Sequence, residues 1–188
     1  SIMGLTPPRS GRIRLEGVEI QNRPSHEVAR AGLALVPEGR QVFPTLTVWE
    51  NLIATAANRS GAEYPWTTQR VFEMFPMLEE RRNFMGRTLS GGEQQMLAIG
   101  RALMLNSKVL ILDDATEGLA PLIRAEIWRC LERLKEAGQS ILVIDRSLDA
   151  LTRIADRHYI MEKGKVVWSG DSAALAAQQE LRLRYLGV

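Results

Sequence analysis

The sequence predicts an α/β fold built on a parallel sheet, with a helical insert and short β-hairpins. Three compact apolar runs, at residues 33–36, 109–112 and 141–144, have the composition of buried strands. Apolar residues spaced three and four apart lie between the second run and the third, which is typical of a helix. A strand, a helix and a strand in this order favour two parallel strands joined by a right-handed crossover.

Composition places the chain among ordinary globular proteins. Its 188 residues are 45% hydrophobic and 24% charged, and we expect one domain over residues 1–188. No apolar run approaches the roughly 18–20 residues that cross a bilayer. The formal net charge of +2 gives no general attraction to nucleic acid or anionic lipid, so a phosphate site must be local. The single cysteine, Cys130, excludes an internal disulfide and a cysteine-built zinc site, in agreement with a reducing cytoplasm.

The first third of the chain predicts a hairpin and then a buried strand. Apolar residues alternate over residues 12–20 around Glu16 and Gly17, which indicates two short strands with a bend between them. The run at residues 33–36 stops at Pro37 and delivers Glu38 and Arg40 into the loop that follows. Ligand sites of open α/β sheets lie at such carboxyl ends.

The middle of the chain predicts helices. From about residue 47 to 104 no strand pattern occurs, and apolar residues recur at helical spacing. The segment therefore reads as a mostly helical insert. Its apolar positions include Val48, Leu52, Ile53, Val71, Met74, Phe75 and Leu78.

The last third predicts the rest of the sheet and a small terminal part. The second strand run closes with Asp113 and Asp114, and the third is followed by Asp145 and Arg146. The helix between them stops before Gly138. A terminal hairpin is expected over residues 159–168 and a helix over residues 175–186.

A capped helix start gives the strongest local signal. Ser90 and Glu93 have the spacing of a capping box directly before an apolar-periodic segment. Gly91 and Gly92 leave backbone N–H groups accessible, and a helix N-terminus of this kind favours phosphate. A capping box is equally typical of an ordinary helix, so the choice between an ordinary helix and a phosphate site depends on the longer sequence around it.

Four ordered strings resemble the motifs of the ATP-binding cassette (ABC) family. LSGGEQQMLAIGRALM resembles the signature motif, and LILDDATEGLAP resembles the Walker B strand and D-loop. VPEGRQVFPTLTVWENL resembles the Q-loop segment, while ILVIDRSLDAL occupies the place of the switch-histidine segment. The match extends over essentially the whole chain in the family's order. Within the family, the strings are most similar to ATPase subunits of branched-chain amino acid importers.

This resemblance implies the fold, the function and the partners. It implies a single nucleotide-binding domain with a P-loop NTPase-like sheet core and a helical subdomain at about residues 47–104. The implied function is the energy-coupling subunit of an importer for branched-chain amino acids. Two alternatives stay open, a urea or amide importer subunit and an inactive partner cassette that contributes only its signature motif. The implied partners are a second ATPase subunit and transmembrane permease subunits, without nucleic acid, at the cytoplasmic face of the membrane.

The resemblance also assigns site residues. In this family two nucleotide-binding domains face head to tail, and each ATP lies between one chain's phosphate-binding loop and the other chain's signature motif. Asp113 would support Mg²⁺ through water, and Glu38, where the family usually has Gln, would assist it. The residues assigned to ATP are Glu38, Leu89, Ser90, Gly91, Gly92, Glu93 and Gln94.

Three departures from the family pattern leave ATP hydrolysis open. Asp114 stands in place of the catalytic Glu, and its shorter side chain retracts the base by about one C–C bond. Arg146 replaces the switch His with a permanent cation. No G-x-x-x-x-G-K-[ST] string occurs, so we expect the chain to lack the N-terminal Walker A part of the family.

Overall fold

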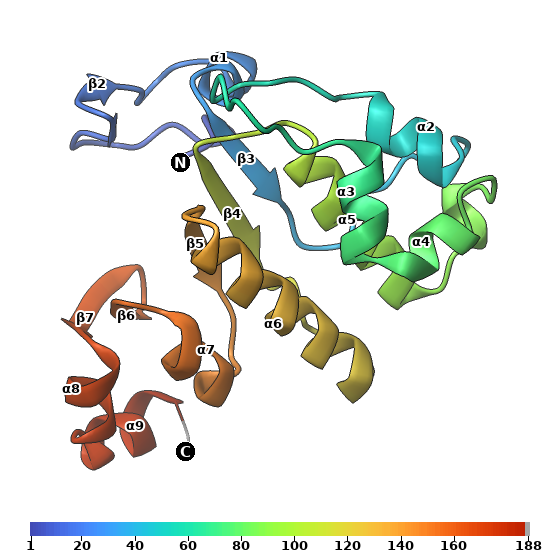
Figure 1. Ribbon diagram of the computed structural model, residues 1–188. Helices are drawn as coiled ribbons and strands as arrows, with labels where there is room; N and C mark the ends of the chain where they lie inside the picture. Colours follow the sequence, from blue (N-terminus) through green and yellow to red (C-terminus); the bar gives the residue numbers. More distant parts are fainter. Residues whose placement is uncertain (187–188) are drawn as a thin grey trace. The chain divides into compact units, whose positions relative to one another are not determined.

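The computed structural model describes residues 1–186 and contains two compact units, Ser1–Ile144 and Asp145–Val188 (Figure 1). The first unit contains β1 (Arg14–Leu15), β2 (Val18–Glu19), α1 (Ser25–Arg30), β3 (Leu33–Val36), α2 (Val48–Ile53), α3 (Thr68–Met74), α4 (Pro76–Glu80), a 3₁₀ turn (Gly86–Thr88), α5 (Gly91–Leu103), β4 (Val109–Asp113), α6 (Pro121–Glu136) and β5 (Ser140–Ile144). The second contains α7 (Leu148–Ile154), β6 (His158–Glu162), β7 (Lys165–Gly170), α8 (Ser172–Ala176) and α9 (Gln179–Leu186).

The first unit is organised around a parallel sheet with the strand order β3-β4-β5 (Figure 1). Val36 pairs with Leu112, and Leu112 pairs with Val143, so the three strands end at nearly the same level. This confirms the predicted parallel arrangement. Since parallel strands present their carboxyl ends at one edge, the residues after β3 and after β4 are brought together there.

Strand β5 departs from the expected burial. It lies at the edge of the three strands, and Leu142 and Ile144 are 38% and 47% exposed. The composition of residues 141–144 predicted a buried strand, which is wrong for these two side chains. Leu142 and Ile144 are two positions apart and project from the same face of β5, and that face is less covered than the one that carries Ile141 and Val143.

The amino-terminal hairpin packs beside the sheet. Glu16 and Gly17 form the bend between β1 and β2, and both have positive φ, 50° and 81°, as the mirror-image hairpin turns require. The hairpin leads to Ile20, which is buried in a cluster with the following helix and the sheet. That cluster contains Ile20, Val28, Leu33 and Ile111, with Met3, Ile13, Leu15, Leu35 and Val109 packed against it.

Helices α2 to α5 lie together between β3 and β4 of the sequence, as the periodicity predicted (Figure 1). Helix α2 begins at a capping box, in which Thr47 Oγ1 accepts from the Glu50 N–H and the Glu50 carboxylate accepts from the Thr47 N–H. Buried Asn51 ties the preceding loop to this helix, because its Oδ1 accepts from the Phe43 N–H at 2.8 Å and its Nδ2 donates to the Phe43 carbonyl. Helix α5 contacts α2, α4 and β3, so its position is fixed from several sides.

Gly100 allows α5 to approach its neighbours closely. A Cβ atom at Gly100 would lie 2.8 Å from Val71 Cγ1 and 3.0 Å from Leu52 Cδ2, and both neighbours are fully buried. We expect Gly100→Leu to lower the free energy of unfolding by about 1–3 kcal/mol through overpacking. Gly100→Ala should be milder, because the gain in helix propensity offsets part of the crowding. Denaturant titration of both variants checks this, and equal stability of Gly100→Leu and wild type would contradict the packing described.

Cys130 is buried on α6 and is expected to be unreactive. Burial raises the pKa of its thiol to about 12, with a smaller opposing effect of Arg133. Because the thiolate is the nucleophile, its fraction at pH 8 is on the order of a thousandfold below that of a thiol with the ordinary pKa. A thiol reagent should therefore label the unfolded chain rapidly and the native chain very slowly. Comparable labelling rates in the two states would show that α6 does not enclose Cys130.

The second unit is a β-hairpin with short helices. Strands β6 and β7 pair antiparallel around a bend at Lys163 and Gly164. Buried His158 is held by Ser172, whose Oγ lies 2.8 Å from Nε2, and burial lowers the pKa of the imidazole. The single helix expected over residues 175–186 is wrong, because α8 and α9 are separate helices. Helix α8 begins earlier, where Asp171 Oδ1 accepts from the Ala174 N–H at 2.7 Å.

Among residues 1–186, no helix has both the length and the apolar character that crossing a membrane requires.

Candidate functional site

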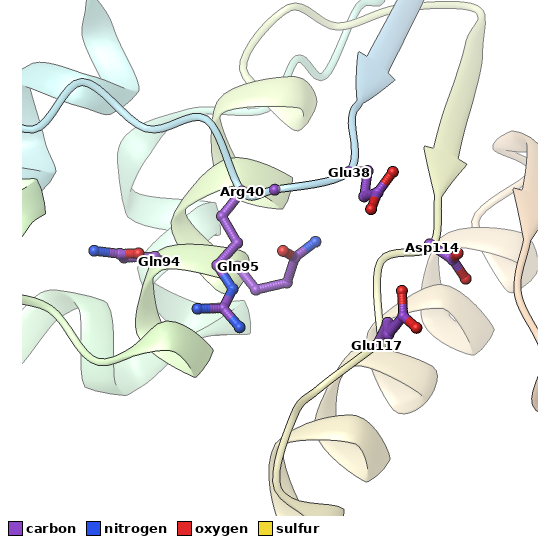
Figure 2. A pocket seen from close by; sticks show the side chains of 7 residues that line it. Glu38, Arg40, Gln94, Gln95, Asp114 and Glu117 are labelled. Carbon is purple, nitrogen blue, oxygen red and sulfur yellow. The ribbon is translucent and has the colours of Figure 1, made fainter.

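An open pocket of about 270 Å³ lies in the first unit, where loops at the carboxyl edge of the sheet meet helix α5 (Figure 2). The loop after β3, the loop after β4 and the first turns of α5 form its walls. Figure 2 shows Arg40, Gln94 and Gln95 on one side, and Glu38, Asp114 and Glu117 on the other. The residues lining the pocket are Glu38, Gly39, Arg40, Gln94, Gln95, Asp114 and Glu117.

The start of α5 carries the predicted capping box. Ser90 Oγ accepts a hydrogen bond from the Glu93 N–H at 3.3 Å, and Glu93 Oε2 accepts one from the Ser90 N–H at 2.7 Å. The Glu93 carboxylate is nearly buried and also pairs with Arg81. The helix geometry gives the N–H groups of Gly91 and Gly92 no partner within α5. The structure thus presents two backbone donors and the Ser90 hydroxyl at a helix N-terminus.

Both glycines at this helix start are in close contact with other segments. A Cβ atom at Gly92 would lie 3.0 Å from Ile123 Cγ2 on α6. A Cβ atom at Gly91 would lie 2.2 Å from Nη1 of Arg40 and 2.7 Å from its Cζ. The guanidinium of Arg40 therefore rests directly against Gly91, and any larger residue there would displace it.

Two residues that were predicted to contact nucleotide make contacts within the protein. Leu89 is buried in the protein interior. Gln94 lines the pocket, and its Nε2 donates to the Gly86 carbonyl at 3.0 Å, which ties the 3₁₀ turn to α5. Both residues fix the approach to the helix start, and direct contact with nucleotide stays a prediction for each of them.

Asp113 and Asp114 follow one another at the end of β4 but differ in setting. Asp113 is the exposed last residue of the strand. Asp114 is half-buried at φ 49°, a left-handed conformation that Asp tolerates better than most residues, and its N–H donates to the Ile144 carbonyl at 2.9 Å. Asp114 lines the pocket together with exposed Glu38, whereas Asp113 does not.

The donor set suits a hydrated hard cation. Over residues 1–186, no three Asp, Glu, His or Cys side chains converge as an all-protein metal site. Mg²⁺ is usually bound through one or two carboxylates, retained waters and substrate phosphates. Asp113 and Glu38, predicted to serve magnesium, are compatible with that mode, and their role stays a prediction.

Arg146 belongs to the second unit. It is exposed and lies between β5 and α7, where its carbonyl accepts from the Leu148 N–H at 2.9 Å. Its predicted catalytic role stays a prediction.

Sequence reasoning assigned no role to four residues that line the pocket, Gly39, Arg40, Gln95 and Glu117. Arg40 was placed in the loop after β3, but its contact with Gly91 joins positions 51 residues apart and has no local signal. Gln95 does have a signal, because it is a polar residue directly before the buried Met96 and Leu97. It is only 4% exposed, and its Nε2 has no hydrogen-bond partner.

Comparison with known proteins shows which family the chain resembles. Residues 1–117 match the ABC transporter family. The chain is 41% identical over 187 residues to the high-affinity branched-chain amino acid transport ATP-binding protein BraG of Pseudomonas aeruginosa, which covers 100% of this chain and 80% of BraG. It is 33% identical over 192 residues to the probable branched-chain amino acid transport ATP-binding protein LivF of Archaeoglobus fulgidus, with 100% and 80% covered.

The fold of the chain is also similar to that of a solved ATP-binding cassette. The ADP conformation of MJ1267, an ATP-binding cassette of an ABC transporter, superposes with a TM-score of 0.78 at 25% identity, covering 100% of this chain and 81% of that one. The sheet, the helical segment and the pocket edge described above thus lie in a known cassette architecture. Because the family match spans most of the chain and BraG aligns along its whole length, the chain belongs to the ABC transporter family.

Proposed function

We propose that this chain is the ATP-binding, energy-coupling subunit of an importer for branched-chain amino acids. The observation that carries the proposal is the similarity to BraG, which extends from one end of the chain to the other. The similarity to LivF supports the same substrate class. Substrate selectivity itself would lie in the transmembrane and substrate-binding subunits with which this chain assembles at the cytoplasmic face of the membrane.

The start of α5 would act on nucleotide held by a second ATPase subunit. Ser90 Oγ and the N–H groups of Gly91 and Gly92 would donate to the γ-phosphate of that ATP, and the helix end would add a partial positive charge. The capping box supports this role, because it fixes the hydroxyl and the helix start in one geometry. Preorganised donors of this kind stabilise charge that develops during phosphoryl transfer.

Glu38 and Asp113 would hold Mg²⁺ beside the nucleotide that this chain itself binds. The ion would neutralise phosphate charge, which is its general contribution to phosphoryl transfer. Asp114 would orient the attacking water less well than a glutamate would, because its carboxylate is retracted. Arg146 would place a cation where a neutral hydrogen-bonding group usually acts.

A second candidate function is favoured by the contrast between these two sets of residues. The capping box at the start of α5 is complete, whereas Asp114 and Arg146 both depart from the family pattern. A cassette of this kind would contribute chiefly its signature end to hydrolysis at the partner's nucleotide. This role is compatible with importer energy coupling.

Transport by the complete assembly tests the proposed function. The chain would be co-purified with its transmembrane subunits and the second ATPase, placed in vesicles with a binding protein, and supplied with Mg²⁺ and ATP. ATP-dependent uptake of leucine, isoleucine or valine is the expected result. Uptake of urea or short amides instead would assign the chain to the neighbouring importer group. ATP hydrolysis that is coupled to neither substrate class would contradict the proposal.

A further inference from the structure

We propose that Arg40 binds a phosphate oxyanion together with the start of α5, and is thus a further nucleotide-contacting residue of this chain. The inference rests on the proposed function, because ATP would supply the phosphate. It concerns a residue of the loop after β3 that lies outside the signature segment itself.

The loop after β3 directs the Arg40 side chain back onto α5. Gly39, Arg40 and Gln41 all have positive φ, at 80°, 66° and 32°, and the Gln41 N–H donates to the Gly39 carbonyl at 2.7 Å. The chain turns sharply at Glu38 and Gly39. Figure 2 shows the Arg40 side chain extending from this turn alongside the helix that carries Gln94 and Gln95. Its guanidinium ends against Gly91, the first residue of α5.

The electrostatic setting of Arg40 is incomplete without an anion. The residue is half-buried, and no hydrogen bond or ion pair to its guanidinium occurs among residues 1–186. The nearby end of α5 carries partial positive charge, so a cation at this place is repelled. An oxyanion bound there would accept from both the guanidinium and the backbone N–H groups, and it would convert the repulsion into attraction.

Gln95 supplies the second, independent observation. It is 4% exposed, yet its Nε2 has no hydrogen-bond partner, although buried polar groups are usually satisfied. Figure 2 shows its amide directed into the pocket that Arg40 also lines. One side of the pocket therefore offers two donors, a guanidinium and an amide, that lack an acceptor. A ligand with several acceptor oxygens fits this pair.

The other side of the pocket limits where such a ligand binds. Glu38, Asp114 and Glu117 are acidic, so a lone anion is repelled from that wall and held on the side of α5. The terminal phosphate of nucleotide held by the partner subunit would therefore meet the α5 side of the pocket, where Arg40 and Gln95 lie. The ligand class is therefore a phosphate oxyanion, either the terminal phosphate of ATP or free inorganic phosphate.

The test uses the assembled transporter with Arg40→Gln and the matched control Arg87→Gln. Arg87 is an exposed arginine in the turn before α5, so the control removes the same charge nearby. We expect Arg40→Gln to lower kcat/KM for ATP by about 10- to 100-fold, the effect of losing one hydrogen bond to a charged group. ADP affinity should not change, because ADP has no terminal phosphate. Arg87→Gln should match wild type in both measurements.

Inhibition by inorganic phosphate distinguishes the two sources of the anion. If Arg40→Gln lowers kcat/KM for ATP and also weakens inhibition by inorganic phosphate, Arg40 contacts the terminal phosphate both before and after hydrolysis. If Arg40→Gln weakens only the inhibition by inorganic phosphate, Arg40 contacts the released product. An Arg40→Gln protein that responds to ATP and phosphate as wild type does would overturn the proposal.

Gln95→Leu keeps the inference testable if Arg40→Gln folds poorly. Replacing an unsatisfied buried amide by an apolar side chain of similar size should raise Tm. Contact with the ligand predicts a simultaneous fall in kcat/KM for ATP, whereas a purely structural Gln95 predicts a higher Tm with unchanged kinetics and would count against the site. Leucine uptake by the wild-type transporter is measured in parallel. Absence of uptake would contradict the proposed function, whereas the effect of Arg40→Gln on kcat/KM for ATP tests the role of Arg40 independently.

Discussion

Replacing Ser90 by arginine is expected to reduce ATP hydrolysis by the assembled transporter about 100- to 1,000-fold, the range found when a preorganised donor to a developing oxyanion is removed. Ser90 combines a hydroxyl donor with the cap of α5, and its Oγ is fixed 3.3 Å from the Glu93 N–H. A long cationic side chain there would fill the space that the γ-phosphate needs. The loss of the cap alone costs roughly 1 kcal/mol, so the protein should remain folded.

Two controls separate this effect from unfolding and from the other half of the site. Ser90→Thr keeps a hydroxyl and a good cap, so it should retain most of the activity. Asp114→Asn should change total hydrolysis little if the signature end is the part of this chain that works. If Asp114→Asn proves more damaging than Ser90→Arg, the nucleotide bound by this chain itself is the one that turns over, and the second candidate function is wrong.

In a chain to which a Walker A loop has been added, lengthening Asp114 to glutamate is expected to raise turnover at this chain's own nucleotide site by about 10-fold or more, within the range of general-base catalysis. Asp114 lines the pocket at the end of β4, and one additional methylene group would advance its carboxylate toward the position of an attacking water. The left-handed φ of 49° is less favourable for glutamate than for aspartate, which sets a modest cost in stability.

This prediction is measured with a partner ATPase whose own catalytic carboxylate has been replaced by an amide. Hydrolysis then reports only the site to which Asp114 belongs. Asp114→Asn is the matched control, because it keeps the size of the side chain and its tolerance of positive φ while it removes the charge. Equal turnover of Asp114→Glu and wild type would show that the shorter carboxylate is no defect.

The sequence predicts those parts of the molecule that depend on local pattern. The parallel strands β3 and β4 follow from short apolar runs, and the cap of α5 follows from the spacing of Ser90 and Glu93. These features depend on residues a few positions apart, where backbone and side-chain preferences act directly. The order of the family motifs also predicts that the loops after β3 and β4 contribute to one site.

Other features depend on contacts between distant segments and were not predictable in this way. The exposure of Ile144 depends on what covers its face of β5, and the composition of the strand does not report this. The contact of Arg40 with Gly91 depends on a loop of positive φ and on how α5 packs beside it. Gln95 shows the same limit, because its polarity at a buried position is visible in the sequence but its missing partner is visible only in the fold.

The most direct measurement is a structure of the assembled transporter with Mg²⁺ and a non-hydrolysable ATP analogue. We expect the terminal phosphate of nucleotide held by the partner subunit within about 2.7–3.2 Å of Ser90 Oγ and of the Gly91 and Gly92 nitrogens. The Arg40 guanidinium should contact the same phosphate. Nucleotide bound in the assembly with the start of α5 facing solvent, or facing a protein surface without phosphate, would contradict the role assigned to this helix start.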